Sequence, residues 1–302
     1  MKIGLMSAAF PNMTLEELAG WAAGEGFQML ELACWPAGEG KDRRYGGVVH
    51  IDVDNLTDAR VDEIHGLLEE HGLEISSLGY YPNCLHPEAA HREHVIDHLK
   101  KVIVGAEKLG VGIVGTFVGR DWHQDLDANF ELFQEIWPPI VRFAGDHGVK
   151  IAIENCPMLY PDTWPGGTNM AISPVVWERM FDIIPDENFG LNLDPSHLIW
   201  QAIDYVQCVY EFGDRIFHVH AKDMEVVEAD LGRIGILDFG WYVPRLPGLG
   251  DVDWQAFVSA LYAVGYDFVL SIEHEDRNWE DTEELVKRGF LLAKKYLDPF
   301  IV

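Results

Sequence analysis

Four short segments in the second half of the chain each end in a side chain that could bind a metal ion. The segments are hydrophobic runs at 150–155, 189–194, 215–221 and 268–274, and the side chains are Glu154, Asp194, His220 and Glu273. Burying a charged group alone is costly, so four such groups at four strand-like ends predict convergence on one cation. Three carboxylates and one imidazole suit a divalent ion: Mn²⁺, which we place first, or Mg²⁺, Co²⁺ or Zn²⁺. The alternative interpretation is four unrelated polar residues, each satisfied by local hydrogen bonds.

Two further histidines lie close to these ligands in the sequence. His218 precedes His220 by two residues on one predicted strand, so both side chains face the same side. One of them could bind the metal while the other contacts substrate or lies deeper. His218 is therefore a candidate substrate contact. His197 follows Asp194 by three residues and is expected at the same rim.

Other residues near the strand ends are candidates for the wall of a pocket. Asn155 ends its strand and is a candidate substrate contact. Lys222 has two interpretations, a polar contact at the rim or an ion pair with Asp223. Glu31 ends the second predicted strand, where it could reach substrate or form a buried ion pair. Trp164 lies in a loop after a strand, and its ring could pack on a sugar or brace the loop.

Strand-like and helix-like segments alternate eight times along the chain. The strand-like runs lie at 2–9, 29–34, 74–80, 112–118, 150–155, 189–194, 215–221 and 268–274. Most are continuously hydrophobic, as parallel strands covered on both faces require. The helix-like stretches lie at 14–24, 58–71, 92–109, 129–147, 174–183, 205–212, 253–264 and 282–296. Glycines follow several of these helices, where a left-handed residue ends a helix at low cost.

This alternation predicts an α/β fold, a (β/α)8 TIM barrel, as a single domain over residues 1–302. A doubly wound open sheet is the alternative, but no G-x-G-x-x-G motif follows the first strand. The loops at 35–57, 156–173 and 224–252 are long and follow predicted strands. Active sites of TIM barrels are built from such loops, so we expect the site there.

Composition narrows the possible partners and locations. The formal net charge is −28, which repels phosphate backbones and anionic membranes, so nucleic acid and membrane are not expected partners. Four scattered cysteines and no apolar run of membrane-spanning length fit a cytoplasmic protein. Lys41, Arg43 and Arg44 form a rare basic cluster, either a solvated loop or a contact for an anionic or polyhydroxylated substrate.

Taken with these strand ends, the chain resembles the xylose-isomerase-like TIM barrel family of sugar phosphate isomerases and epimerases, which also includes inosose dehydratases and endonuclease IV. The resemblance spans nearly the whole chain and is most specific at Ile153-Glu154-Asn155, Asn192-Leu-Asp194-Pro-Ser-His197, His218-Val-His220-Ala-Lys-Asp223, Pro247-Gly-Leu-Gly250 and Ile272-Glu273. It implies that Glu154, Asp194, His220 and Glu273 hold one divalent metal and that His197 contacts substrate.

The resemblance also implies a chemistry that the ligand set supports. A divalent ion would bind the carbonyl and adjacent hydroxyl of a sugar and stabilise an enediolate. Glu154 and Glu273 would remove and return a proton at carbon, which gives epimerisation or aldose–ketose isomerisation. The predicted function is therefore a metal-dependent sugar isomerase or epimerase, with a small carbohydrate as its partner and a homo-oligomer as a possible assembly.

Two departures from the family keep other functions open. The ketose 3-epimerases of the family carry a second glutamate six residues after the first ligand and an arginine six after the metal histidine. Tyr160 and Val226 stand at these positions. The alternatives are a dehydratase or lyase acting on an oxidised sugar, such as an inosose or a keto-glycoside, and a non-catalytic sugar-binding subunit.

Overall fold

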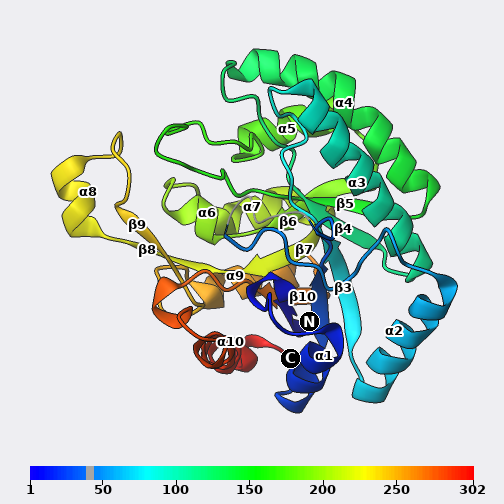
Figure 1. The fold of residues 1–302 in the computed structure, drawn as a ribbon. Coiled ribbons are helices and arrows are strands. Elements are labelled where there is room, and N and C mark those ends of the chain that lie inside the picture. The colour runs from blue at the N-terminus through cyan, green and yellow to red at the C-terminus, as the bar shows by residue number, and fades with distance from the viewer. Residues whose placement is uncertain (39–43) are drawn as a thin grey trace.

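The computed structural model describes residues 1–38 and 44–302, and its centre is a closed barrel of parallel strands (Figure 1). The barrel strands are β1 (Lys2–Met6), β2 (Met29–Ala33), β3 (Glu74–Gly79), β4 (Ile113–Thr116), β5 (Lys150–Glu154), β6 (Phe189–Leu193), β7 (Ile216–Ala221) and β10 (Val269–Ile272). They follow one another around the barrel in chain order, and β10 pairs with β1 to close it. The predicted (β/α)8 barrel is confirmed.

Helices alternate with the barrel strands, as predicted. They are α1 (Leu15–Gly24), α2 (Asp58–His71), α3 (Ala89–Lys108), α4 (Leu126–Asp146), α5 (Pro174–Ile183), α6 (Ser196–Ile199), α7 (Tyr205–Phe212), α9 (Trp254–Ala263) and α10 (Glu283–Leu297). The short α6 was not predicted, and α3 and α4 each begin three residues earlier than predicted. In Figure 1 the helices lie outside the strands, so every barrel strand is covered, which explains why its sequence is continuously hydrophobic.

The predicted helix ends are confirmed by the backbone. Gly26, Gly72, Gly110, Gly148 and Gly265 have φ angles of 78°, 64°, 66°, 68° and 80°. This left-handed conformation is favourable for glycine and unfavourable for most other residues. Each of these glycines ends a helix and turns the chain into the next barrel strand.

Two further features of the fold differ from the sequence prediction. The loop at 224–252 contains an antiparallel hairpin, β8 (Asp223–Val226) and β9 (Tyr242–Arg245), with α8 (Glu228–Ile234) between its strands. Figure 1 shows this excursion projecting from one side of the barrel. The predicted first strand is also too long, because β1 ends at Met6 and residues 7–9 form a 3-10 turn. There the Ser7 hydroxyl accepts a hydrogen bond from the backbone N–H of Ala33 at 2.8 Å.

Within residues 1–38 and 44–302, no helix is long and apolar enough to cross a membrane. All four cysteines are free thiols. Lys41 and Arg43 of the predicted basic cluster lie outside the described residues. Arg44 pairs with the carboxylate of Glu280 and donates a hydrogen bond of 2.8 Å to the backbone oxygen of Glu275. Its guanidinium is therefore held by the protein at the rim of the barrel.

Candidate metal centre

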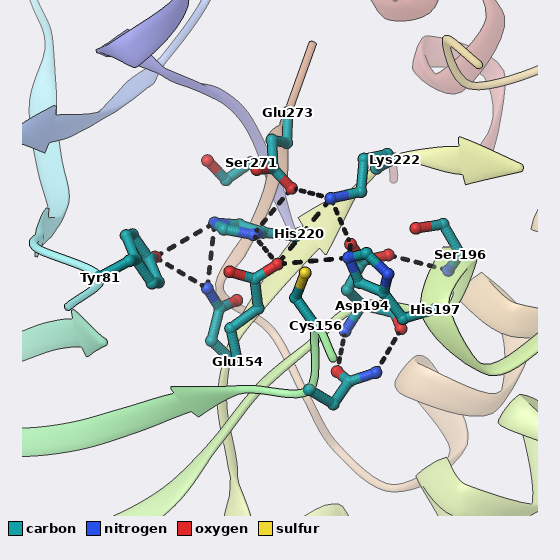
Figure 2. A network of polar contacts seen from close by, with 12 residues as sticks. Tyr81, Glu154, Cys156, Asp194, Ser196, His197, His220, Lys222, Ser271 and Glu273 are labelled. Atoms are coloured by element: carbon teal, nitrogen blue, oxygen red, sulfur yellow. Dashed lines mark hydrogen bonds and ion pairs between the residues drawn. The ribbon is translucent and has the colours of Figure 1, made fainter. Parts of the chain in front are cut away.

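The four predicted ligands meet at one end of the barrel. Glu154 is the last residue of β5, Asp194 and Glu273 directly follow β6 and β10, and His220 is the penultimate residue of β7. One ligand atom from each lies within 4.8 Å of those of the other three. Figure 2 shows the four side chains pointing toward one another from separate strands. Because parallel strands end at the same rim of a barrel, residues far apart in the chain are brought to one point.

These ligand atoms have the character of an ion site. Glu154 Oε1, Asp194 Oδ2 and His220 Nδ1 are buried and have no hydrogen-bond partner among the described residues. A buried polar atom without a hydrogen bond costs about 1–3 kcal/mol, which ion contacts such as that of Asp194 Oδ2 with Lys222 Nζ at 3.2 Å offset in part. Their mixed oxygen and nitrogen chemistry fits a divalent cation.

The carboxylate of Glu31 contacts His220 on the ring nitrogen that faces away from the other predicted ligands. Nε2 of His220 lies 2.8 Å from Oε2 of Glu31, and the Ser271 hydroxyl donates to the same oxygen at 3.0 Å. The Tyr81 hydroxyl donates to the other oxygen of Glu31. Burial lowers the pKa of His220, but the carboxylates around the ring raise it well above its ordinary value, so the contact with Glu31 is an ion pair. On metal binding, Nδ1 would give up its proton and face the other predicted ligands, while the Nε2 proton stays directed at Glu31. Of the two interpretations of Glu31, the buried ion pair is the one observed.

Asn155 fixes the aspartate ligand. Its side-chain amide donates to the backbone oxygen of Asp194 at 2.9 Å and accepts from the backbone N–H of Asp194 at 2.8 Å. The backbone N–H of Ser196 donates to Oδ1 of Asp194 at 2.8 Å, which leaves Oδ2 facing the other ligands. Asn155 was predicted to contact substrate, but both atoms of its buried amide are engaged within the protein. Its observed contacts position the predicted ligand Asp194, and a substrate contact by Asn155 remains a prediction.

Lys222 lies among the acidic residues of the site. Its Nζ is 2.6 Å from Glu273, 3.2 Å from Asp194 and 3.9 Å from Glu154 (Figure 2). The same Nζ lies 3.3 Å from Glu275. The side chain is buried, so these contacts are weakly screened by solvent. Four carboxylates and one ammonium leave three negative charges, and a divalent cation would reduce them to one.

The predicted alternative partner of Lys222, Asp223, faces the opposite side of the strand. Its carboxylate accepts hydrogen bonds from the backbone N–H groups of Met224, Gly248 and Val252 and from the indole of Trp254, at 2.8 to 3.0 Å. Successive side chains of a strand point to opposite faces, so Lys222 and Asp223 do not pair. The interpretation as an ion pair between them is wrong, and Asp223 instead fixes the loop that follows β9.

The charges around the site lower the pKa values of its glutamates and raise that of its lysine, so both kinds of group stay charged. Burial raises the pKa of Glu273, but Lys222 and His220 lower it to about 2. Burial likewise raises the pKa of Glu154, but His220, His197 and Lys222 hold it well below its usual range. Burial lowers the pKa of Lys222, yet the surrounding carboxylates raise it well above its ordinary value. At neutral pH the carboxylates are therefore ionised and the lysine is charged.

The other two predicted histidines occupy different depths. Nε2 of His197 lies 3.3 Å from Asp194 and 3.6 Å from Glu154, at the rim with the ligands. His218 lies deeper, where its Nδ1 bonds to Asn192 at 3.0 Å and its Nε2 to Ser76 at 3.1 Å. Burial lowers the pKa of His218 to about 4, so the ring is neutral. Of the two expected places for His218, the structure shows the deeper one.

Trp164 braces two loops. Its indole N–H donates to the backbone oxygen of Leu237 at 2.8 Å, and its ring centroid is 5.5 Å from that of Phe239 and 6.0 Å from that of Trp200. Among the described residues, Trp164 does not line the cavity over the carboxylates. The bracing interpretation therefore matches the observed contacts, and a sugar contact by Trp164 remains a prediction.

Several residues of the site were missed in the sequence. The cavity over the carboxylates is also lined by Tyr81, Cys156 and Glu275. Cys156 and Glu275 each follow a ligand by two residues, the same spacing that linked His218 to His220. Because residues two apart in an extended segment face the same side, this spacing could have predicted Cys156 and Glu275 as part of the site. Tyr81 follows β3 and had no such signal, because its partner Glu31 is supplied by another strand.

Comparison with known proteins decides the family. Residues 19–296 match the family described as Xylose isomerase-like TIM barrel. The chain belongs to this family. Its membership confirms the predicted resemblance over most of the sequence.

Two relatives of this chain have different names. It is 26% identical to the uncharacterized protein YfiH of Bacillus subtilis, over 91% of this chain and 93% of that protein. It is 29% identical to an inosose dehydratase of Lacticaseibacillus casei, over 40% of this chain and 41% of the dehydratase.

Solved structures of the xylose isomerase-like fold superpose on almost the whole chain. An IOLI protein with a bound zinc atom matches with a TM-score of 0.73 and 18% identity, over 100% of this chain and 98% of that one. A D-psicose 3-epimerase in the presence of D-fructose matches with a TM-score of 0.72 and 16% identity, over 100% and 99%. At these identities the likeness shows the shared fold.

Proposed function

We infer that the protein is a divalent-metal-dependent isomerase or epimerase of a sugar or sugar derivative, acting by proton transfer through an enediolate. The observation that carries this proposal is the convergence of Glu154, Asp194, His220 and Glu273 within 4.8 Å, with three of their atoms buried and without a hydrogen bond among the described residues. The zinc-bound IOLI protein and the D-psicose 3-epimerase, which share the fold, support the same class.

These four residues would hold the metal ion, with Mn²⁺ first and Mg²⁺, Co²⁺ or Zn²⁺ as alternatives. When bound, the ion would supply a positive charge that stabilises negative charge developing on substrate oxygens. The protein contributes the fixed geometry, because Glu31 orients His220 and Asn155 orients Asp194.

The two glutamates are suited to move protons at carbon. Glu154 Oε1 and Glu273 Oε2 lie 3.5 Å and 3.3 Å from Nδ1 of His220 and come from different strands of the barrel. Both carboxylates are ionised, which is the form that accepts a proton. One glutamate would take the proton from carbon. The other, after taking up a proton from water, would return it to the opposite face, which inverts the carbon. Returning it to the neighbouring carbon moves the carbonyl.

A lyase or dehydratase acting on an oxidised sugar is the second candidate. Tyr160 and Val226 replace the glutamate and arginine of the ketose 3-epimerases. The charged Nζ of Lys222, 2.6 Å from Glu273, is a proton donor beside the proposed base. Such a donor could protonate a leaving group on the carbon next to the one that loses its proton. The similarity to inosose dehydratases favours this candidate as well.

A carbohydrate is the expected partner in either case, and a homo-oligomer and a cytoplasmic location remain predictions from the sequence. The net charge of −28 argues against nucleic acid. The remaining alternative is a non-catalytic sugar-binding subunit, which would have the same fold but would transfer no proton.

The test combines metal analysis with proton exchange. Purified protein is expected to hold one divalent ion per chain and to exchange a carbon-bound proton when incubated in deuterated water with ketoses, inososes and 3-keto-glucosides. Exchange without loss of water or aglycone supports the isomerase or epimerase, and loss of either supports the lyase. Glu273→Gln should abolish exchange, whereas Glu70→Gln, on the exposed face of α2, should not. Full exchange by Glu273→Gln would contradict the mechanism.

A further inference from the structure

A second cavity adjoins the metal centre on the side of the β8–β9 hairpin. It has a volume of about 460 Å³, within the range of roughly 300–1,000 Å³ typical of small-molecule sites. It shares Cys156, Met158 and Glu275 with the cavity over the carboxylates, so the two spaces are neighbours. His197, whose Nε2 is 3.3 Å from Asp194, also lines it. A molecule whose reacting end faces the carboxylates could therefore extend into this cavity.

The wall of this cavity contains a stacked aromatic pair. The rings of Trp200 and Tyr242 lie 4.3 Å apart with an angle of 14° between their planes, and Phe239 lies beside them. Trp164 packs against all three rings, at centroid distances of 5.5 to 6.4 Å, and is tied to the hairpin by its indole N–H. The bracing keeps the flat surface in place, which lowers the entropic cost of binding a flat ligand.

Two polar atoms of the same pair have no partner. Trp200 Nε1 and Tyr242 Oη are buried, and neither has a hydrogen bond within the described part of the chain. An indole N–H can only donate, and a phenol can donate or accept. An unpaired buried polar atom costs about 1–3 kcal/mol, which a ligand carrying an acceptor oxygen would remove. The pair thus offers a flat apolar face together with hydrogen-bonding groups.

We propose that the substrate is an aryl glycoside or its oxidised form, with the sugar at the metal centre and the aromatic aglycone in the hairpin cavity. This inference rests on the proposed function and deepens it. Beyond the aromatic pair, the wall includes the apolar residues Leu159, Met224 and Val243, and also Arg44 and Arg277. Arg44 is already held by Glu280 and the backbone oxygen of Glu275. A second sugar would bring hydroxyls on every side and would leave several of them unpaired against this wall. An aromatic ring with one oxygen substituent matches both the apolar wall and the unpaired donors.

The experiment compares three neutral probes that share one sugar. Calorimetric titration of the metal-loaded protein with phenyl β-D-glucoside, methyl β-D-glucoside and cellobiose measures the contribution of the aglycone. We expect phenyl glucoside to bind at least tenfold more tightly than the other two. Trp200→Leu should reduce this preference to about threefold or less. Trp122→Leu, in a different cavity, is the matched control and should keep it.

Tyr242→Leu is a second variant that decides the question if Trp200→Leu does not fold, as judged by circular dichroism. Equal binding of phenyl and methyl glucosides, tighter binding of cellobiose, or a preference that survives in the folded variants would overturn the aryl site. Metal content and deuterium exchange are measured on the same samples. If wild-type protein prefers the aryl probe but holds no metal and exchanges no proton, the proposed function fails and the aromatic site stands. If it exchanges protons without an aryl preference, only the aryl site fails.

Discussion

Nε2 of His220 lies 2.8 Å from the carboxylate of Glu31, while Nδ1 of the same ring faces Glu154 and Glu273. The two nitrogens of one imidazole thus serve different neighbours. In a metal-bound ring, the inner carboxylate would set the tautomer and the outer nitrogen would be the ligand. Glu31 is itself fully buried and held by Tyr81 and Ser271, so this orientation is set by the barrel interior.

Replacing Glu31 with glutamine should weaken metal binding without removing a ligand. The amide keeps the size of the carboxylate but loses the charge that fixes the Nε2 proton of His220. Loss of such a supporting partner typically costs about 10- to 100-fold in metal affinity. Titration of Mn²⁺ by calorimetry measures this effect, and Glu69→Gln on the exposed face of α2 is the control. An unchanged affinity in Glu31→Gln would show that the tautomer is set in another way.

Replacing Lys222 with methionine should make stability depend on metal. The change leaves four carboxylates close together without their ammonium, and breaking a buried pair of charges costs about 3–5 kcal/mol. A divalent cation would replace the lost charge. Urea unfolding with EDTA should therefore show a large loss of stability that saturating Mn²⁺ largely restores.

The control for this prediction is Lys101→Met, because Lys101 forms an exposed ion pair with Asp54. Exposed pairs contribute about 1 kcal/mol or less. Mn²⁺ should raise the free energy of unfolding of Lys101→Met by the same amount as it raises that of wild-type protein. A Lys222→Met protein as stable as wild type in EDTA would argue that the carboxylates are not all ionised.

Asp223 should be important for stability and have little effect on metal binding. Its carboxylate accepts four hydrogen bonds, from Gly248 and Val252 in the loop at 247–252, from Trp254 at the start of α9, and from the neighbouring Met224. The loop packs closely on this carboxylate, because a Cβ on Gly250 would lie 2.4 Å from its Oδ1. Asp223→Ala leaves these donors buried without an acceptor, so we expect a loss of about 3 kcal/mol or more. Urea unfolding measures the loss, and Asp62→Ala on α2 should cost little. A loss below 0.5 kcal/mol, roughly the effect of an ordinary surface change, would contradict the role of Asp223.

His50 should make the protein less stable in mild acid. Burial lowers the pKa of His50 from 6.5 to about 4. Below pH 6.5 the unfolded chain takes up a proton that the folded protein resists, so the stabilisation present above pH 6.5 is lost progressively down to about pH 4. By linkage the loss between pH 7 and pH 5 is about 2 kcal/mol.

His50→Gln should reduce the difference between the free energies of unfolding at pH 7 and pH 5 by about that amount. The other buried histidines are the same in both proteins, so the comparison isolates His50. His123→Gln, at an exposed position, is the control and should leave the pH dependence as in wild type. An identical pH dependence in His50→Gln and wild type would show that His50 is not buried in its neutral form.

The strand ends carry much of the information about the candidate site. Glu154, Asp194, His220 and Glu273 could be selected because each stands where a continuous hydrophobic run ends. A buried parallel strand requires such a run, and its end at the barrel rim is where a polar side chain can be used. The glycines after the helices likewise allowed the helix ends to be predicted, because a left-handed backbone at that position favours glycine.

The contacts that these residues make with other parts of the chain could not be predicted from the sequence in the same way. Glu31 and His220 are 189 residues apart, and only closure of the barrel brings β2 and β7 close enough for their contact. Lys222 had two interpretations, a polar contact at the rim or an ion pair with Asp223, and the choice depended on which face of its strand turned inward. The hairpin at 223–245 was missed because its strands are short and only half-buried at β9, so they lack the hydrophobic pattern of the barrel strands.

The amino-acid sequence by itself determined the barrel, the order of its strands and the four residues at its rim, since local hydrophobic runs and turns encode these directly. Only the tertiary structure decided which carboxylate supports His220, where the charge of Lys222 lies and that an aromatic cavity adjoins the site. Those features depend on distances between segments remote in the chain, which take definite values only when the barrel closes.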